Sequence, residues 1–105
     1  MKSRKTLAFK KEYGKPILLG RKTLTIRLNS NLKEGDVVEV RAGGVVLGKA
    51  LIEEVKVKKV LELTDEDAVN DGFRSREELL RALKNIYKDR ISASTEVKLI
   101  KFKLL

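Results

Sequence analysis

Thr23-Leu-Thr-Ile-Arg-Leu28 alternates between polar and apolar side chains, residue by residue. Successive side chains of a β-strand point to opposite faces, so this period of two predicts a half-buried strand over residues 23–28. The apolar face would carry Leu24, Ile26 and Leu28. The polar face would carry Thr23, Thr25 and Arg27, and these three side chains are therefore expected to lie together.

The residues before this strand predict a second strand and a helix. Residues 6–9 have the pattern of a short strand, and residues 10–19 that of a short helix with Gly20 as its C-cap. Tyr13, Ile17 and Leu18 would share one face of that helix. Pro16 lies late in this segment and is expected to break the helix there.

The residues after it predict a hairpin, a further short strand, two helices and a closing strand. Residues 37–40 and 45–57 are β-branched strand material around the turn Ala42-Gly43-Gly44, and residues 60–63 favour another short strand. Thr64 and Ser75 precede helical segments as N-caps, and Asn70-Asp71-Gly72 ends the first helix. Residues 96–105 alternate again. The apolar stripe of the second helix comprises Leu79, Leu80, Leu83, Ile86 and Tyr87.

The order of these elements predicts a single α+β domain over residues 1–105. A mainly antiparallel sheet that curls into a small β-barrel with flanking helices fits this order. A chain of 105 residues has room for one hydrophobic core, and its 42% hydrophobic content is enough to fold.

Composition excludes several classes of protein. The chain has no His and no Cys, so a zinc finger, a disulfide framework, a Ser-His-Asp triad and a catalytic thiol are ruled out. We expect no metal and no cofactor. No apolar run approaches the roughly 20 residues that span a bilayer. We therefore expect no membrane partner and a soluble cytoplasmic protein, monomeric by default.

The positive charge is concentrated at one end of the sequence. Residues 1–33 hold ten basic side chains and a single acid, Glu12, so this stretch carries the whole net charge of +9. Such a concentration favours a polyanion as partner. A solvated face on a Lys- and Glu-rich, thermophile-like protein is the simpler alternative. Five aromatic residues are too few for a broad base-stacking surface, so recognition in one pocket is favoured over recognition along a strand.

Several segments together resemble the ASCH domain (activating signal cointegrator homology) family. They are Gly20-Arg-Lys-Thr-Leu-Thr-Ile-Arg27, Leu32-Lys-Glu-Gly-Asp-Val37, Leu63-Thr-Asp-Glu-Asp-Ala68, Asp71-Gly-Phe73 and Ile100-Lys-Phe102. The resemblance covers roughly residues 15–105. It implies a PUA-like fold, a small β-barrel with helices packed across it and a cleft beside the barrel, and it implies RNA binding.

Small single-domain members of this family are similar to the bacterial acetylcytidine amidohydrolases. Those enzymes use a Lys, a Thr and a Glu, and the resemblance places the Lys on Lys22, the Thr on Thr25 and the carboxylate on Asp71. This sequence therefore has a carboxylate one methylene shorter than the enzymes have.

The amidohydrolase chemistry requires a nucleophile and a base without histidine. A Thr hydroxyl beside a neutral Lys amine is a workable pair, provided that the pKa of Lys22 is lowered by burial and by the neighbouring Arg21 and Arg27. A nearby carboxylate acts in the opposite direction. Lys22 and Thr25 are three residues apart, so they share a cleft only if Lys22 lies in the turn before the strand.

Three hypotheses follow for function. The first is an RNA- or nucleotide-binding module, in which Arg21, Lys22, Thr23, Thr25 and Arg27 line the cleft and the basic N-terminal third holds phosphates. The second is an N4-acetylcytidine amidohydrolase with Lys22 as base, Thr25 as nucleophile and Asp71 as orienting carboxylate. The third is a protein-interaction adaptor. Simpler interpretations remain for single residues: strand propensity for Thr23 and Thr25, a surface ion pair for Arg27, and a helix-ending turn for Asp71.

Overall fold

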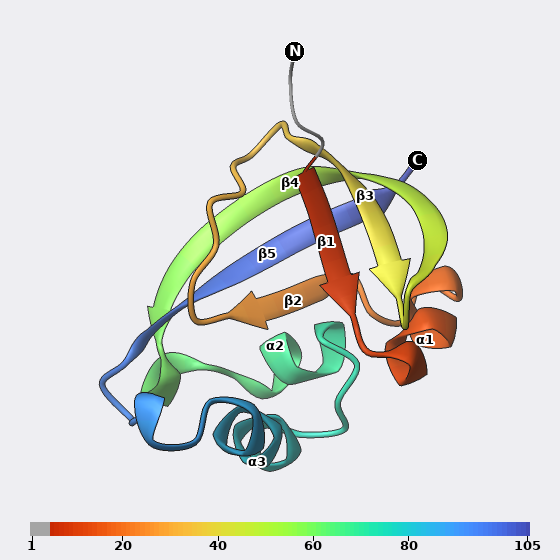
Figure 1. The fold of residues 1–105 in the computed structure, drawn as a ribbon. Helices are drawn as coiled ribbons and strands as arrows, with labels where there is room; N and C mark the ends of the chain where they lie inside the picture. The colour runs from red at the N-terminus through yellow and green to blue at the C-terminus, as the bar shows by residue number, and fades with distance from the viewer. Residues whose placement is uncertain (1–4) are drawn as a thin grey trace.

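The computed structural model describes residues 5–105, which form one curled five-stranded sheet with helices packed against it (Figure 1). The strand order is β1-β3-β4-β5-β2. β1 pairs parallel with β3, and every other pair is antiparallel. The α+β class and the mainly antiparallel, barrel-like sheet are therefore confirmed. The strands are β1 (Lys5–Phe9), β2 (Leu24–Arg27), β3 (Val37–Ala42), β4 (Val45–Lys59) and β5 (Glu96–Leu104).

β4 gives the sheet its curl because it is long enough to pair with two different neighbours. Its first half pairs with β3 and its second half with β5. The register with β5 shifts between Ile52 and Glu54, and such a bulge bends a strand and increases its twist. The bend brings the two edge strands, β1 and β2, to the same side of the arch (Figure 1).

Two apolar clusters lie on opposite faces of the sheet. One face packs side chains such as Val38, Ile52 and Phe102, and the other face, under the helices, packs Ile26, Leu83 and Leu99. β5 contributes to both, because its alternate residues face opposite ways and both faces are covered. The side-chain alternation predicted for residues 96–105 is therefore confirmed over residues 97–102, with apolar residues on each face.

The predicted helix caps are confirmed at α2 (Asp65–Asn70) and α3 (Arg76–Tyr87). The Thr64 hydroxyl accepts from the Asp67 N–H at 3.1 Å, and the Asp67 carboxylate accepts from the Thr64 N–H at 3.0 Å. Ser75 accepts from the Glu78 N–H at 3.3 Å. These caps satisfy N–H groups that the first turn of a helix leaves free. They fix where each helix begins.

The helix predicted over residues 10–19 is instead divided in two. A 3₁₀ turn, η1 (Lys11–Tyr13), is followed by the short helix α1 (Gly14–Leu18). The break falls before Gly14 and not at Pro16 as predicted, because Pro16 lies in the first turn of α1, where its missing N–H is not needed, while its ring would collide with a carbonyl one turn earlier in a continuous helix. Gly14 and Ile17 are the buried residues of this short helix, and the predicted apolar position Leu18 is exposed.

The strand predicted over residues 60–63 is wrong. Residues Val60–Glu62 form a 3₁₀ turn, η2. The Glu62 carboxylate accepts from the Lys59 N–H at 2.8 Å, and the Val60 N–H donates to the Thr95 carbonyl at 2.9 Å. These bonds turn the chain away from the sheet before α2. A second such turn, η3 (Lys88–Arg90), follows α3. No helix within residues 5–105 has the length and apolar character to cross a membrane.

Candidate functional site

A cleft of about 170 Å³ opens beside the unpaired edge of β2. β1 and η1 form one wall through Ala8 and Tyr13, and α3 forms the other through Leu83 and Tyr87. Ile26 of β2 lies between the two walls. The cleft therefore lies where the curled sheet fails to close, between strand β1 on one side and the helix layer on the other.

Lys22 and Asp71 form a buried ion pair in this cleft. Their exposed fractions are 4% and 5%. The Lys22 ammonium donates to the Asp71 carboxylate, to the Asp71 main-chain carbonyl at 2.8 Å and to the Leu24 carbonyl at 3.4 Å. Lys22 precedes β2, which begins at Leu24, so it lies in the turn that the sequence spacing required. The ion pair thus joins the start of β2 to the end of α2.

Asp71 reaches the cleft because it ends α2. Its N–H donates to the carbonyls of Asp67 and Ala68, at 3.0 and 3.1 Å, and Gly72 follows with a φ of 90°. Such a left-handed conformation suits glycine. A Cβ at Gly72 would also contact the Lys22 side chain at 3.6 Å. The helix-ending role and the place in the cleft therefore belong to the same residue.

Burial shifts the pKa of both members of the pair toward the neutral form. Burial raises the pKa of the Asp71 carboxyl to about 6, against the opposing attraction of Lys22. Burial likewise lowers the pKa of the Lys22 ammonium, against the attraction of Asp71, while the nearby Arg27 lowers it further. A lowered pKa is what the amidohydrolase hypothesis requires for Lys22 to act as a base.

Thr25 and Arg27 share one face of β2, as predicted, and are hydrogen-bonded to each other. Arg27 Nε donates to Thr25 Oγ1 at 2.9 Å, and Arg27 Nη2 donates to the Ala8 carbonyl of β1 at 2.7 Å. Thr25 is 4% exposed, so its side chain lies in the interior and not on a solvent-exposed face of the strand. Arg27 forms no ion pair with any described residue. It links the two unpaired edges of the sheet instead.

Aromatic rings surround these polar groups, and their convergence was not predicted. Four of the five aromatic side chains in the sequence line the cleft. The Lys22 ammonium lies 5.4 Å from the Phe9 ring centre and 4.9 Å from that of Tyr13, and the Arg27 guanidinium lies 5.0 Å from Phe9. These are cation–π distances. The four residues are Phe9, Tyr13, Phe73 and Tyr87.

The remaining predicted binding residues lie elsewhere. Arg21 is exposed and Thr23 is half-buried, and neither lines the cleft. The Thr23 N–H donates to the Asn70 carbonyl at 2.9 Å, which fixes the start of β2 against α2. Lys10, which was not predicted, does line the cleft. Lys22, Thr25, Arg27 and Asp71 are thus the predicted residues that the fold brings together.

The basic N-terminal third is divided among different roles. Lys5 pairs with Asp36 at 2.8 Å, and Lys22 is buried. Lys2 and Arg4 lie outside the described residues. Among residues 5–105 no cluster of three or more His, Cys, Asp or Glu side chains could hold a metal ion. Five cations of this stretch remain exposed on the surface: Lys10, Lys11, Lys15, Arg21 and Lys33.

The raised pKa of Asp71 predicts how stability depends on pH. The pKa is about 6 in the fold against 3.8 for the free group, so the folded state binds the proton more tightly between these values. The contribution of Asp71 to stability is complete below about pH 4 and is lost as pH rises through about 6. The loss should reach about 3 kcal/mol, because one pKa unit equals about 1.4 kcal/mol.

Urea unfolding of the wild type and of Asp71→Asn between pH 4 and 7 measures this contribution. Asparagine does not titrate, so the free energy of unfolding of the wild type should fall relative to that of Asp71→Asn as pH rises from 4 to 7. A difference that stays constant from pH 4 to 7 would show that the carboxyl has an ordinary pKa.

Comparison with known proteins agrees with the fold. No protein-family model and no curated protein sequence matches this chain. Among solved structures, an ASCH domain from Lactobacillus crispatus matches with a TM-score of 0.79 and 15% identity, over 94% of this chain and 80% of that one. A protein from Enterococcus faecalis matches with a TM-score of 0.76 and 16% identity, over 100% and 83%.

A third structure, ASCH from Zymomonas mobilis, matches with a TM-score of 0.68 and 18% identity, over 96% of this chain and 68% of that one. At such identities the likeness concerns the fold alone. It agrees with the curled sheet, the strand order and the helix layer described above. The chain therefore has an ASCH-like fold, the PUA-like small barrel with flanking helices that its sequence motifs implied.

Proposed function

We propose that this protein binds a nucleotide or an RNA segment and holds a single base in the cleft beside β2. The observation that carries the proposal is the concentration of four of the chain's five aromatic side chains around the buried Lys22 and the half-buried Arg27. Aromatic faces and guanidinium planes are the groups on which unstacked bases rest in RNA-binding proteins.

The size of the cleft limits what it can hold. About 170 Å³ is less than the roughly 300–1,000 Å³ typical of pockets for drug-sized ligands. One flat ring system would fit, and the ribose and phosphate would remain at the rim. Lys10 lines the cleft and is exposed, so it is placed to meet a phosphate there.

Titration of ¹⁵N-labelled protein with cytidine and uridine monophosphates, and with a single-stranded hexamer of each, tests the proposal. Amide signals of the β1, β2 and α3 residues around the cleft should shift and saturate. The hexamers should bind with a steep salt dependence, since each phosphate contact releases a counterion. A perfect RNA duplex is the control, because its bases are not free to enter. No saturable shift with any single-stranded ligand would refute the proposal.

The amidohydrolase hypothesis is retained as a second candidate because Lys22, Thr25 and Asp71 line the same cleft. Hydrolysis would convert N4-acetylcytidine and water into cytidine and acetate. Thr25 Oγ1 would attack the acetyl carbonyl as its proton passes to neutral Lys22, and the hydrogen bond from Arg27 Nε at 2.9 Å would stabilise the developing charge on that oxygen. The C–N bond would then break as Lys22 returns the proton to the departing cytidine amine, and water would hydrolyse the acetyl ester on Thr25 to release acetate. The shifts of Lys22 and Asp71 toward their neutral forms lower the cost of moving the proton between them.

Thr25→Val is the decisive variant for this candidate, because it removes the hydroxyl and keeps the shape of the side chain. Chromatography of an incubation with N4-acetylcytidine should show cytidine with the wild type, and at least about 100-fold less with the variant. Thr6→Val is the matched control, since Thr6 is an exposed strand residue outside the cleft. Absence of cytidine with the wild type would remove the amidohydrolase hypothesis and leave the binding proposal intact. The adaptor hypothesis stays a prediction.

A further inference from the structure

The main-chain groups along β2 divide between its two edges. The Phe102 N–H donates to the Thr23 carbonyl at 3.0 Å, so the carbonyl of Thr23 points toward β5. In an antiparallel pair, alternate residues exchange bonds with the partner strand, so the main-chain groups of Thr25 and Arg27 also point toward β5. Those of Leu24, Ile26 and Leu28 therefore point to the opposite edge, with which none of the strands described in residues 5–105 pairs.

Side chains cap this free edge on both sides of Ile26. The Leu24 carbonyl accepts from the Lys22 ammonium at 3.4 Å, and the Leu28 N–H donates to the Tyr87 hydroxyl at 3.2 Å. No side chain of the described residues caps the N–H or the C=O of Ile26. Ile26 is 5% exposed, yet it lines the cleft. A nearly buried main-chain donor and acceptor thus adjoin the cavity without a partner among residues 5–105.

The opposite wall does not supply that partner. The Phe9 carbonyl accepts from the Gly43 N–H on the β3 side at 3.1 Å, so the main chain of Ala8 points toward the cleft. Its carbonyl already accepts from Arg27 Nη2 at 2.7 Å. Since buried main-chain groups in proteins are nearly always hydrogen-bonded to protein, water or ligand, the N–H and C=O of Ile26 are available to a ligand that displaces water from the cleft.

We propose that the N–H and C=O of Ile26 bind the Watson–Crick edge of the base in the cleft, which makes Ile26 the residue that selects unpaired bases. This inference rests on the proposed function. An extended residue presents its donor and its acceptor side by side, and the Watson–Crick edge of each base offers the complementary pair. A base already paired in a duplex has no such edge free. The stacking aromatic rings accept any base face, so they cannot make this distinction.

Matched nucleosides test the inference on the unaltered protein. Uridine is compared with 3-methyluridine, and cytidine with N4,N4-dimethylcytidine, because each methylated partner is neutral and lacks the donor on its Watson–Crick edge. The 5-methyl nucleosides are the controls, since their added methyl lies away from that edge. Blocking the edge should weaken binding about 10- to 100-fold, as expected for a buried group left unpaired. The 5-methyl forms should bind within about twofold of the parents.

The amide signal of Ile26 provides an independent readout in the same titrations. It should move downfield at saturation with uridine or cytidine, and its hydrogen exchange should slow. If the blocked and parent nucleosides bind equally and the Ile26 signal stays in place, the inference is overturned and base binding in the cleft still stands. If no nucleoside binds, the proposed function fails first, and the inference fails with it.

Discussion

Replacing Lys22 with methionine is expected to lower the free energy of unfolding by about 3–5 kcal/mol at pH 8, because it leaves Asp71 as an uncompensated buried charge. Methionine keeps most of the length of the side chain, so the loss of packing is small. A domain of this size is stabilised by about 5–15 kcal/mol in total. Loss of this one ammonium therefore threatens the fold itself.

Urea unfolding at pH 8 and pH 5 tests both the size and the cause of this effect. At pH 5 the penalty should shrink, because Asp71, whose pKa is already raised to about 6, takes up a proton and becomes neutral. The double variant Lys22→Met/Asp71→Leu should recover most of the stability, since it removes both charges.

Lys56→Met is the matched control for Lys22→Met. Lys56 lies 3.6 Å from Glu54 in an exposed ion pair, and such pairs contribute at most about 1 kcal/mol. Equal costs for the two substitutions, or a cost at Lys22 that does not depend on pH, would show that an uncompensated charge on Asp71 is not the cause of the loss.

Arg27→Ala is expected to weaken nucleotide binding by about 10- to 100-fold, the value of one or two charge-assisted hydrogen bonds. The variant removes a cation beside the Phe9 ring, the bond to the Thr25 hydroxyl and the bridge to the Ala8 carbonyl. Arg27→Lys should restore the salt dependence but little of the affinity, because an ammonium cannot make the two divergent bonds of the guanidinium.

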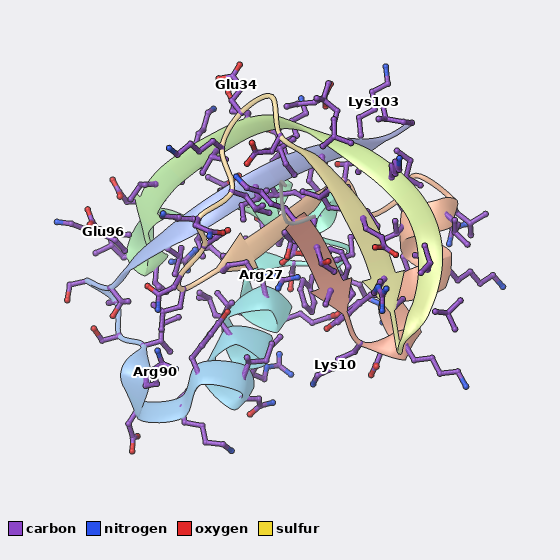
Figure 2. The ribbon with its side chains drawn as sticks, turned by 45° about the horizontal axis from the view of Figure 1, so that its top comes forward. Lys10, Arg27, Glu34, Arg90, Glu96 and Lys103 are labelled. Carbon is purple, nitrogen blue, oxygen red and sulfur yellow. The ribbon has the colours of Figure 1, made fainter. Side chains whose placement is uncertain are left out.

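Arg90→Ala is the matched control, because it removes the same side chain and the same charge. Arg90 is exposed in η3 at one end of the molecule, away from Arg27 (Figure 2). The affinity of the Arg90→Ala variant for nucleotides should stay within about twofold of the wild-type affinity. If both variants lose affinity equally, net charge rather than the cleft would account for binding.

Local patterns in the sequence were sufficient to predict β2 and the caps of α2 and α3. The alternation around Thr25 and Arg27 places both side chains on one face, and the spacing of Lys22 from Thr25 requires a turn that the structure contains. Each of these features depends on residues a few positions apart. Strand period and capping chemistry are local, so one sequence is enough to read them.

The composition of the cleft could not be predicted in the same way. Phe9 and Tyr13 reach it through the parallel pairing of β1 with β3, and Phe73 and Tyr87 reach it through the packing of α3. Neither arrangement leaves a local pattern. For Asp71, the sequence suggested either a helix-ending turn or a carboxylate of the site. In the fold this residue ends α2 and also pairs with Lys22 in the cleft. Long-range packing therefore decides which of the scattered aromatic and charged residues form a site.

The place of β5 in the sheet also determines when this chain can fold during synthesis. β5 is the last strand in the sequence, yet it lies between β4 and β2, and it is the one strand with which β2 pairs. A nascent chain that has not reached residues 96–104 leaves the apolar side chains of Leu24 and Ile26 without their sheet. β2 can therefore join the sheet, and the cleft beside it can form, only after β5 has been translated. A chaperone that covers apolar strands would act before that point.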